Sequence, residues 1–334
     1  MDGRISRPCF ILNMTLSFVF FLGSTMRAIH MTQDVQSQNM LMTGARQTMA
    51  AWSKLLESRE EIPALYQSQF EEHFAEGAAF PYVIWMPALN RTAGWTTEKL
   101  ICDTPEALYI FEKNGKQVDA FSYVYGDVYS VEDGNILLDA WLMVSGKTQG
   151  GEVRVTALHF NMTSKRYFEG ILRKLRGFHP DADASALAAQ KDKFNALSNR
   201  SFKFMNYGRE SLLPGETVQG FIHQPGIKNP FFSILGMTFY KPASLAYMVV
   251  STDRELILIQ ETGNDKELSP ARYGGIWQYV PLRCVDSVTV EALTADTVKL
   301  LIRCQPDAVI ERVFDGAALP ELERFCTDLR TMTE

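Results

Sequence analysis

A phosphate-binding loop is the first chemistry that the residue types of this chain suggest. Gly146-Lys147-Thr148 matches the last three residues of such a loop, in which backbone amides and a lysine hold phosphate groups. The full motif also needs a glycine five residues before Gly146, where this chain has Trp141. Gly150 and Gly151 follow at once, so we interpret the segment as a polar hairpin turn.

The histidines and cysteines do not form a catalytic or metal-binding pattern. No HExxH motif or paired histidine spacing occurs, and no serine lies in GxSxG. The cysteines lack CxxC pairs and zinc spacing, so we expect small core residues in a reducing compartment. A catalytic triad could still assemble in three dimensions, but we predict a non-enzymatic protein without metal or cofactor. The residues considered are His30, His73, His159, His179, His223, Cys9, Cys102, Cys284, Cys304 and Cys326.

Residues 224–242 are the first candidate binding element. The segment QPGIKNPFFSILGMTFYKP lies between two expected strands and carries aromatic residues flanked by Lys228 and Lys241. Phe231 and Phe232 have the character of a loop that dips into a membrane or binds a partner, and the lysines suit anionic headgroups. The alternative is a buried strand, because short apolar runs bounded by Gly and Pro usually belong to the core.

A cluster of cations on an expected helix is the second candidate. The five cations are accompanied by a single acid, Glu169, and could hold an anionic lipid surface. The alternative is a solvated helix face with cations near its C-terminal end, where the helix dipole favours them. The cluster consists of Lys165, Arg166, Arg173, Lys174 and Arg176.

Composition limits the classes of partner. With 46% apolar and 22% charged residues, the 334-residue chain is globular and long enough for two domains and a leader. The net charge of -6 argues against nucleic acid as the main partner, because phosphate binding needs a basic face.

The first thirty residues leave three interpretations open. Arg4 and Arg7 precede an apolar run at 9–23 that resembles a secretory signal but has no small-x-small cleavage site. The run is shorter than the about 20 residues that span a membrane. It is an uncleaved signal-anchor, a poorly cleaved signal peptide, or a start assigned too early, with Met31 as the true start. We favour the last, and hence a cytoplasmic protein, because unpaired cysteines suit export poorly.

An internal repeat organises the rest of the chain. Residues 100–115 align without a gap with 248–263, and share Thr104 with Thr252 and Gly115 with Gly263. Further along, 128–131 matches 285–288 and 160–175 matches 314–329. Such a self-match predicts two copies of one small module.

Periodicity predicts the elements of each copy. Residues 31–76 are expected to be helical: Met49, Trp52, Leu55 and Leu56 mark one helix, and Leu65, Phe70 and Phe74 mark a second after Pro63. The strands expected in the first copy are 99–103, 107–112, 120–125, 128–132, 135–144 and 152–160. Asn114-Gly115 and Asp133-Gly134 predict hairpin turns.

Each copy is expected to end in one amphipathic helix. The apolar stripes recur at i, i+3, i+4 and i+7: Phe168, Ile171, Leu172 and Leu175 in the first copy, and Leu322, Phe325, Cys326 and Leu329 in the second. Ser164 is the expected cap of the first helix, and Asp315 and Pro320 begin the second. Residues 181–200 are expected to form a helical connector.

Two segments of the second copy resemble a known family. Residues 246–259 (AYMVVSTDRELILI) are similar to a hairpin of bacterial pleckstrin-homology-like (PH-like) and GRAM-like domains, and 279–290 (YVPLRCVDSVTV) to a later strand of those domains. The first copy departs from the pattern at 104–106 and 125–127. The resemblance implies a fold rather than a ligand, and a non-enzymatic binding or scaffold role.

Together these observations predict an α+β, mainly β protein. It consists of a leader or mis-assigned start at 1–30, a helical segment at 31–78, PH-like modules at 79–178 and 209–334, and a helical connector at 179–208. Each module is expected to be a bent antiparallel sheet or open barrel capped by its C-terminal helix. The predicted function is peripheral membrane or lipid association; the alternative is a peptide-binding module without lipid affinity. The sequence leaves the oligomeric state open.

Overall fold

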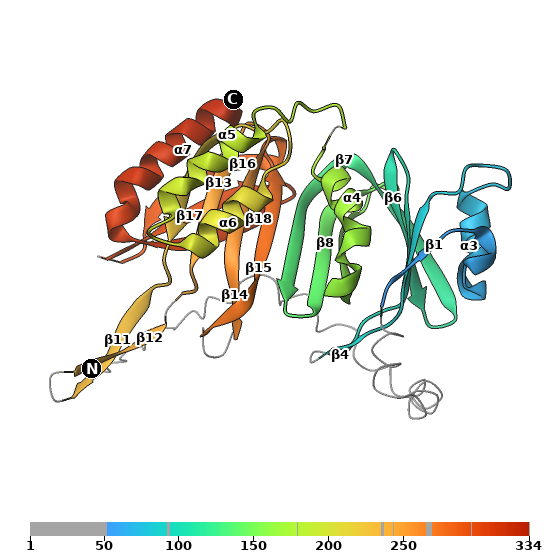
Figure 1. Cartoon of the computed structure of the whole chain (residues 1–334), viewed down its shortest axis with the longest axis horizontal. Helices are drawn as coiled ribbons and strands as arrows, with labels where there is room; N and C mark the ends of the chain where they lie inside the picture. The colour runs from blue at the N-terminus through green and yellow to red at the C-terminus, as the bar shows by residue number, and fades with distance from the viewer. Residues whose placement is uncertain are drawn as a thin grey trace, which may run out of the picture. The chain divides into compact units, whose positions relative to one another are not determined.

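Antiparallel strands contain more residues than the helices do, 46% against 27% (Figure 1). The computed structural model describes residues 52–334 except 92–93, 179, 235–236, 243, 265–268, 295 and 334. The interpretations of residues 1–30 and the first part of the expected helical segment therefore lie outside the described residues. The expected class is confirmed at the level of an α+β, mainly β fold with one large and one smaller antiparallel sheet and a C-terminal helix.

The elements carry the labels of Figure 1. Up to the connector they are β1 (Lys54–Leu56), α3 (Ala64–His73), β2 (Tyr82–Met86), β3 (Asn90–Arg91), β4 (Gly94–Trp95), β5 (Lys99–Asp103), β6 (Ala107–Asn114), β7 (Gln117–Ile136), β8 (Asp139–Thr148), β9 (Val153–Asn161) and α4 (Lys165–Leu175). The remaining elements are α5 (Leu187–Asp192), α6 (Phe202–Ser211), β10 (Val218–Gln224), β11 (Lys228–Ile234), β12 (Met237–Pro242), β13 (Tyr247–Thr252), β14 (Glu255–Asn264), β15 (Ser269–Pro281), β16 (Val285–Ala292), β17 (Thr297–Cys304), β18 (Ala308–Asp315) and α7 (Leu319–Thr333).

The long strand β7 joins the two copies into one sheet. Its first half pairs with β6, and its second half lies between β8 and β15. The strand order is β1-β2-β5-β6-β7-β15-β14-β13-β10, with β8 and β9 branching from β7. In the β7–β15 ladder Asp133 is opposite Trp277 and Val131 is opposite Tyr279. The second copy is therefore held to the first by backbone hydrogen bonds.

The same order of elements occurs in both copies. In the second, β10, β13, β14 and β15 form four successive neighbours, β16–β18 form a three-stranded sheet, and α7 follows. In the first, β2, β5, β6 and the first half of β7 correspond to the four strands. The second half of β7, β8 and β9 then correspond to the three, and α4 follows.

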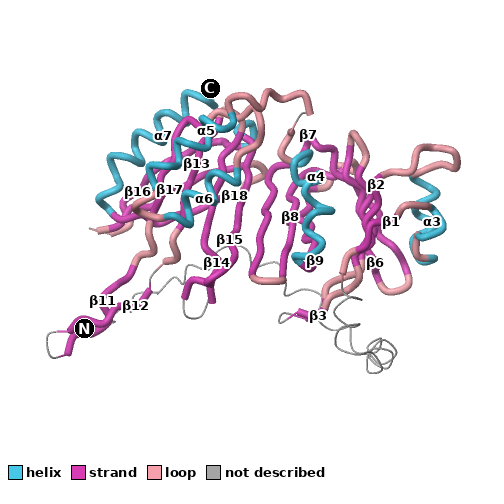
Figure 2. The backbone as a smooth tube through the Cα atoms, in the orientation of Figure 1, coloured by secondary structure: helices cyan, strands magenta, loops and turns pink. Residues whose placement is uncertain are grey.

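Figure 2 shows helix α4 alongside the strands of the first copy and helix α7 alongside those of the second. Each helix buries its predicted stripe in the core of its own copy. Phe168, Ile171 and Leu175 of α4 pack with the strands of the first copy. The stripe of α7 packs in the same way in the second copy. The amphipathic helices are therefore confirmed, because the 3.6-residue period leaves one apolar face that must be covered.

The opposite face of each four-stranded region is covered by the helix that precedes it. Tyr66 and Phe70 of α3 pack against β2, β5 and β6, and Phe204 and Met205 of α6 pack against β13 and β14. Helix α3 confirms the expected helix after Pro63. Helices α5 and α6 lie largely within the expected connector, but α6 continues past it to Ser211 and is the counterpart of α3.

One helix prediction was wrong. Residues 54–56 form strand β1, in which Leu55 is opposite Ile84 and Leu56 is opposite Val83. Trp52, Leu55 and Leu56 have helical spacing, but pairing with β2 outweighs this local preference. The local sequence pattern gives no information about that pairing.

One turn prediction was also wrong. Asn114-Gly115 ends β6 at a two-residue turn as predicted, with Gly115 at φ +63°. Asp133 and Gly134 instead lie inside β7, and the turn falls at Leu137 and the residue after it. Gly134 is required by its neighbour across the ladder, since a Cβ there would lie 2.1 Å from the Trp141 ring.

Replacing Gly134 by alanine is expected to lower the free energy of unfolding by about 1–3 kcal/mol. The added methyl group forces the Trp141 indole out of its place on β7, and overpacking of this kind carries that cost. Gly126→Ala is the matched control, because nothing lies within 4 Å of its Cβ position. Urea unfolding of both variants measures the difference, and equal stabilities would contradict this account.

The caps agree with the sequence in one copy only. The Asp315 carboxylate accepts from the Ala317 amide, as expected. Ser164 makes no side-chain cap, and the Asn161 side chain accepts from the Thr163 amide instead. A short 3-10 turn before α4 moves the cap three residues earlier than the periodicity indicates.

Candidate binding surfaces and the module junction

The 224–242 segment forms a hairpin outside the core sheets. Strands β11 and β12 pair with each other as a two-stranded sheet (Figure 1). Phe232 is opposite Phe239 and Ile234 is opposite Met237, and a bulge falls between Pro230 and Phe232. Because opposite positions and alternate positions share a face, these four positions lie on one face of the ribbon. The two strands thus form a sheet of their own, and the alternative of a buried strand stays open because the burial of these side chains lies outside the described residues.

The side chains of this hairpin lie outside the described residues. Lys228, Phe231, Phe232 and Lys241 are therefore located by backbone position only. Lys228 pairs with Pro242 and Lys241 with Asn229, at the end of the ribbon away from the turn. Whether these residues bind a surface stays a prediction.

The cations of α4 do not form one exposed face. Lys165 Nζ lies 2.9 Å from Asp133, and Lys174 Nζ lies 2.9 Å from Asp103. Arg176 is almost fully buried, with 4% of its side chain exposed. Because intramolecular carboxylates neutralise these three cations, the expected basic face is reduced.

The other two cations of the set make aromatic contacts. Arg166 donates to the Tyr167 hydroxyl at 3.1 Å and is exposed. The Arg173 guanidinium lies 5.9 Å from the centroid of the Phe178 ring. The structure therefore separates the five predicted residues into two near the surface and three engaged in ion pairs.

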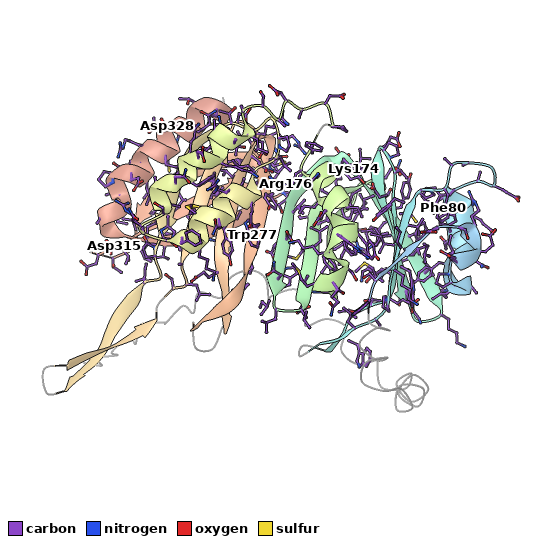
Figure 3. All side chains as sticks on the ribbon, in the orientation of Figure 1. Phe80, Lys174, Arg176, Trp277, Asp315 and Asp328 are labelled. Atoms are coloured by element: carbon purple, nitrogen blue, oxygen red, sulfur yellow. The ribbon has the colours of Figure 1, made fainter. Side chains whose placement is uncertain are left out.

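Arg176 fixes the junction between the copies instead (Figure 3). Its Nε donates to Glu255 Oε1 at 3.0 Å, and its Nη2 donates to the Ser211 carbonyl at 2.7 Å. Glu216 lies 3.7 Å from the same guanidinium, and the Tyr279 ring centroid lies 3.7 Å from its central carbon. One residue of the first copy therefore contacts four segments of the second half of the chain.

Two buried carboxyl groups around one guanidinium require an extra proton. Burial raises the pKa of Glu216 to about 8, and the neighbouring Glu255 carboxylate adds to this effect while Arg176 opposes it. A hydrogen bond between the Glu216 and Glu255 carboxyl groups also raises the pKa of Glu216, because only a protonated carboxyl group can donate to a carboxylate.

A turn conserved between the copies positions Glu255. The Thr252 hydroxyl accepts from the amides of Arg254 and Glu255 at 3.2 and 3.1 Å. Thr104 accepts from the amides of Glu106 and Ala107 in the same way. The turn explains the Thr104–Thr252 match and places Glu255 where the first copy has Ala107. The sequence did contain a signal for this site: the second copy has an acid, Glu255, at the start of a buried strand where the first copy has Ala107.

The remaining chemistry-bearing residues have structural roles. Cys102, Cys284, Cys304 and Cys326 are buried, as predicted for core residues, and burial raises the pKa of each thiol. Cys9 lies outside the described residues. Gly146-Lys147-Thr148 is the end of strand β8, and the polar hairpin turn expected there begins only after Thr148. The Thr148 hydroxyl accepts from the Glu152 amide at 3.2 Å across that turn.

His223 packs against the Phe204 ring, and burial lowers its pKa. Within residues 52–334 as described, no three His, Cys, Asp or Glu side chains are placed to hold a metal ion. No helix in that part of the chain is both long and apolar enough to cross a membrane.

Neither a scan against protein-family models nor a search of curated proteins finds a match for this chain.

Proposed function

We propose that this chain is a non-enzymatic binding protein built from two PH-like modules. The order of four strands, three strands and a helix, found twice, supports the proposal. The resemblance of 246–259 and 279–290 to PH-like and GRAM-like domains supports it independently. Each terminal helix packs in the hydrophobic core of its own copy, so the sequence repeat corresponds to two cores.

The β11–β12 hairpin is the proposed binding element, and its register is the observation that carries the proposal. The positions of Phe232, Ile234, Met237 and Phe239 share one face of a ribbon that belongs to neither core sheet. Ser233 and Thr238 occupy the other face. An amphipathic ribbon of this kind suits a water–lipid interface, where burying a large apolar side chain contributes roughly 1.5–3 kcal/mol.

Anionic vesicles test the membrane proposal. The chain is expected to pellet with vesicles of phosphatidylserine and phosphatidylcholine, and less so at high salt because lysines near the surface attract anionic lipid. Phe231→Ser/Phe232→Ser is expected to weaken partitioning by at least roughly tenfold. Ser233→Ala/Thr238→Ser, on the polar face, is the matched control. Absence of vesicle binding at low salt would remove the proposal.

A protein partner is the second candidate, and the ion pairs of α4 favour it. Lys165, Lys174 and Arg176 are neutralised within the chain, which leaves less charge for an anionic surface. The apolar face of the hairpin would then enter a groove of the partner. This alternative predicts that vesicles are inert, and that Phe231→Ser/Phe232→Ser releases a stoichiometric partner that the control variant retains.

A further inference from the structure

The outer edge of β9 is a strand edge without the usual protection. β9 is nine residues long and pairs with β8, and among the described strands it has no second neighbour. Its sequence, VRVTALHFN, contains neither proline, lysine nor acid. Val153 and Val155 are 48% and 59% exposed. Edges of this length and composition are templates for pairing with another strand.

The hydrogen-bond phase of β9 shows which groups point to that edge. The Thr148 amide donates to the Glu152 carbonyl at 2.7 Å, and the register pairs Gly146 with Arg154 and Val144 with Thr156. Hydrogen-bonded pairs alternate with non-bonded pairs along an antiparallel ladder, so the backbone N–H and C=O groups of Arg154 and Thr156 point toward β8. The backbone groups of Val153, Val155 and Ala157 therefore point to the open edge.

The second copy provides an internal comparison. The match of 160–175 with 314–329 places Asp307, Val309 and Glu311 of the second copy at the positions of Val153, Val155 and Ala157. Side chains also bond the backbone of β18: Tyr247 donates to the Val313 carbonyl, and Gln224 accepts from the Asp315 amide. Glu311 therefore places an acid on β18 where the first copy has Ala157, and Asp307 places a second acid in the turn just before the strand.

The other long open edge of the large sheet is blocked. At β10, Gln190 accepts from the Val218 amide at 2.9 Å, and Lys193 donates to the Val218 carbonyl at 2.6 Å. A register shift between Val218 and Gly220 also bends that strand. Of these edges, β9 alone combines length, exposed valines and absence of acids.

We propose that β9 is a self-association edge, on which a second copy of this chain pairs its own β9 antiparallel about a two-fold axis at Val155. In this register Val155 meets Val155 of the other copy, and Val153 meets Ala157. On the other face of the proposed ladder, Arg154 of one copy lies opposite Thr156 of the other, so no two like charges are directly opposite each other. Arg154 is already paired with Glu112 at 3.4 Å and lies over the Phe121 ring. An isologous contact of this kind closes at a dimer.

Sedimentation velocity of the full chain tests the proposal. The wild type is expected to sediment at twice 37.7 kDa at high concentration. Val155→Lys is expected to raise the dimer dissociation constant at least about tenfold, because it places two cations on the axis. Val309→Lys, at the matching position of β18, should leave the dimer intact. A monomeric wild type, or a dimer that survives Val155→Lys, would overturn the proposal.

Cysteine cross-linking fixes the register independently. In a Cys9→Ser background, Val155→Cys is expected to form a disulfide-linked dimer, because directly opposite strand residues meet disulfide geometry. Val153→Cys alone should not cross-link, whereas Val153→Cys mixed with Ala157→Cys should. Equal cross-linking of Val153→Cys and Val155→Cys would contradict the proposed β9–β9 register centred on Val155. A dimer lost in Phe231→Ser/Phe232→Ser, but not in Val155→Lys, would assign the contact to the hairpin instead.

Discussion

Replacing Arg176 by alanine is expected to lower the free energy of unfolding by about 3–5 kcal/mol. The change leaves the Glu255 carboxylate buried beside Glu216 without its partner, and breaking a buried ion pair from one side has this cost. It also removes the donor to the Ser211 carbonyl and the cation over the Tyr279 ring. Urea unfolding measures the loss.

Two further variants separate the ion pair from simple packing. Arg166→Ala, on the exposed face of the same helix, should change stability by less than about 0.5 kcal/mol. Arg176→Met/Glu255→Leu removes both charges and should recover most of the loss, since apolar replacement of a whole buried pair is often neutral. A loss below about 1 kcal/mol for Arg176→Ala would contradict the assigned role.

The pH dependence follows from the raised pKa of Glu216. Its folded pKa is about 8 and its ordinary value is 4.5, so the folded state binds the additional proton between these values. Stability contributed by this group is then present below pH 4.5 and is lost as the pH rises to about 8. Glu216→Gln should flatten this part of the profile. An unchanged slope would show that Glu216 does not hold the proton.

The sequence was sufficient wherever the deciding interactions are local. Strand Lys99–Asp103 was predicted because a short apolar run bounded by polar residues indicates a buried strand, and all five of its residues are buried. The stripe of α4 was predicted because the 3.6-residue period shows which face of the helix is buried. The turn at Asn114-Gly115 was predicted because Gly115 supplies the positive φ it needs. Asp133-Gly134 has the same local composition, yet Lys165 and Trp141 hold it inside a strand. Those partners lie outside any local window.

The candidate site was less accessible to sequence. The cations of α4 were identified as a group, but their partners Asp133, Asp103 and Glu255 are 32, 71 and 79 residues distant in the chain. A charge pattern does not show which cations are neutralised. The pairing of β7 with β15 was missed for a related reason: two separate modules and two edge-joined modules have the same hydrophobic pattern. The composition of 224–242 was informative, and the register adds which residues share a face.

Replacing Leu329 by aspartate is expected to unfold the second copy before the first. Leu329 is 1% exposed in the cluster that α7 forms with β16 and β17. Removing a buried leucine alone costs about 2–5 kcal/mol, and the aspartate adds a buried polar group without a partner. Hydrogen exchange should rise most across residues 285–333. Thr327→Asp, on the exposed side of the same helix, is the matched control.

The mirror variant in the first copy distinguishes two cores from one. Leu175 corresponds to Leu329 and is also 1% exposed, but it packs in the cluster of the first copy. Leu175→Asp should therefore raise exchange mainly in residues 99–161. Leu172 contacts the clusters of both halves, so Leu172→Asp should loosen the two together. If Leu329→Asp and Leu175→Asp instead gave the same exchange pattern, the copies would unfold as one cooperative unit. That result would mean that the β7–β15 ladder couples the unfolding of the two copies, although each copy has its own core and its own terminal helix.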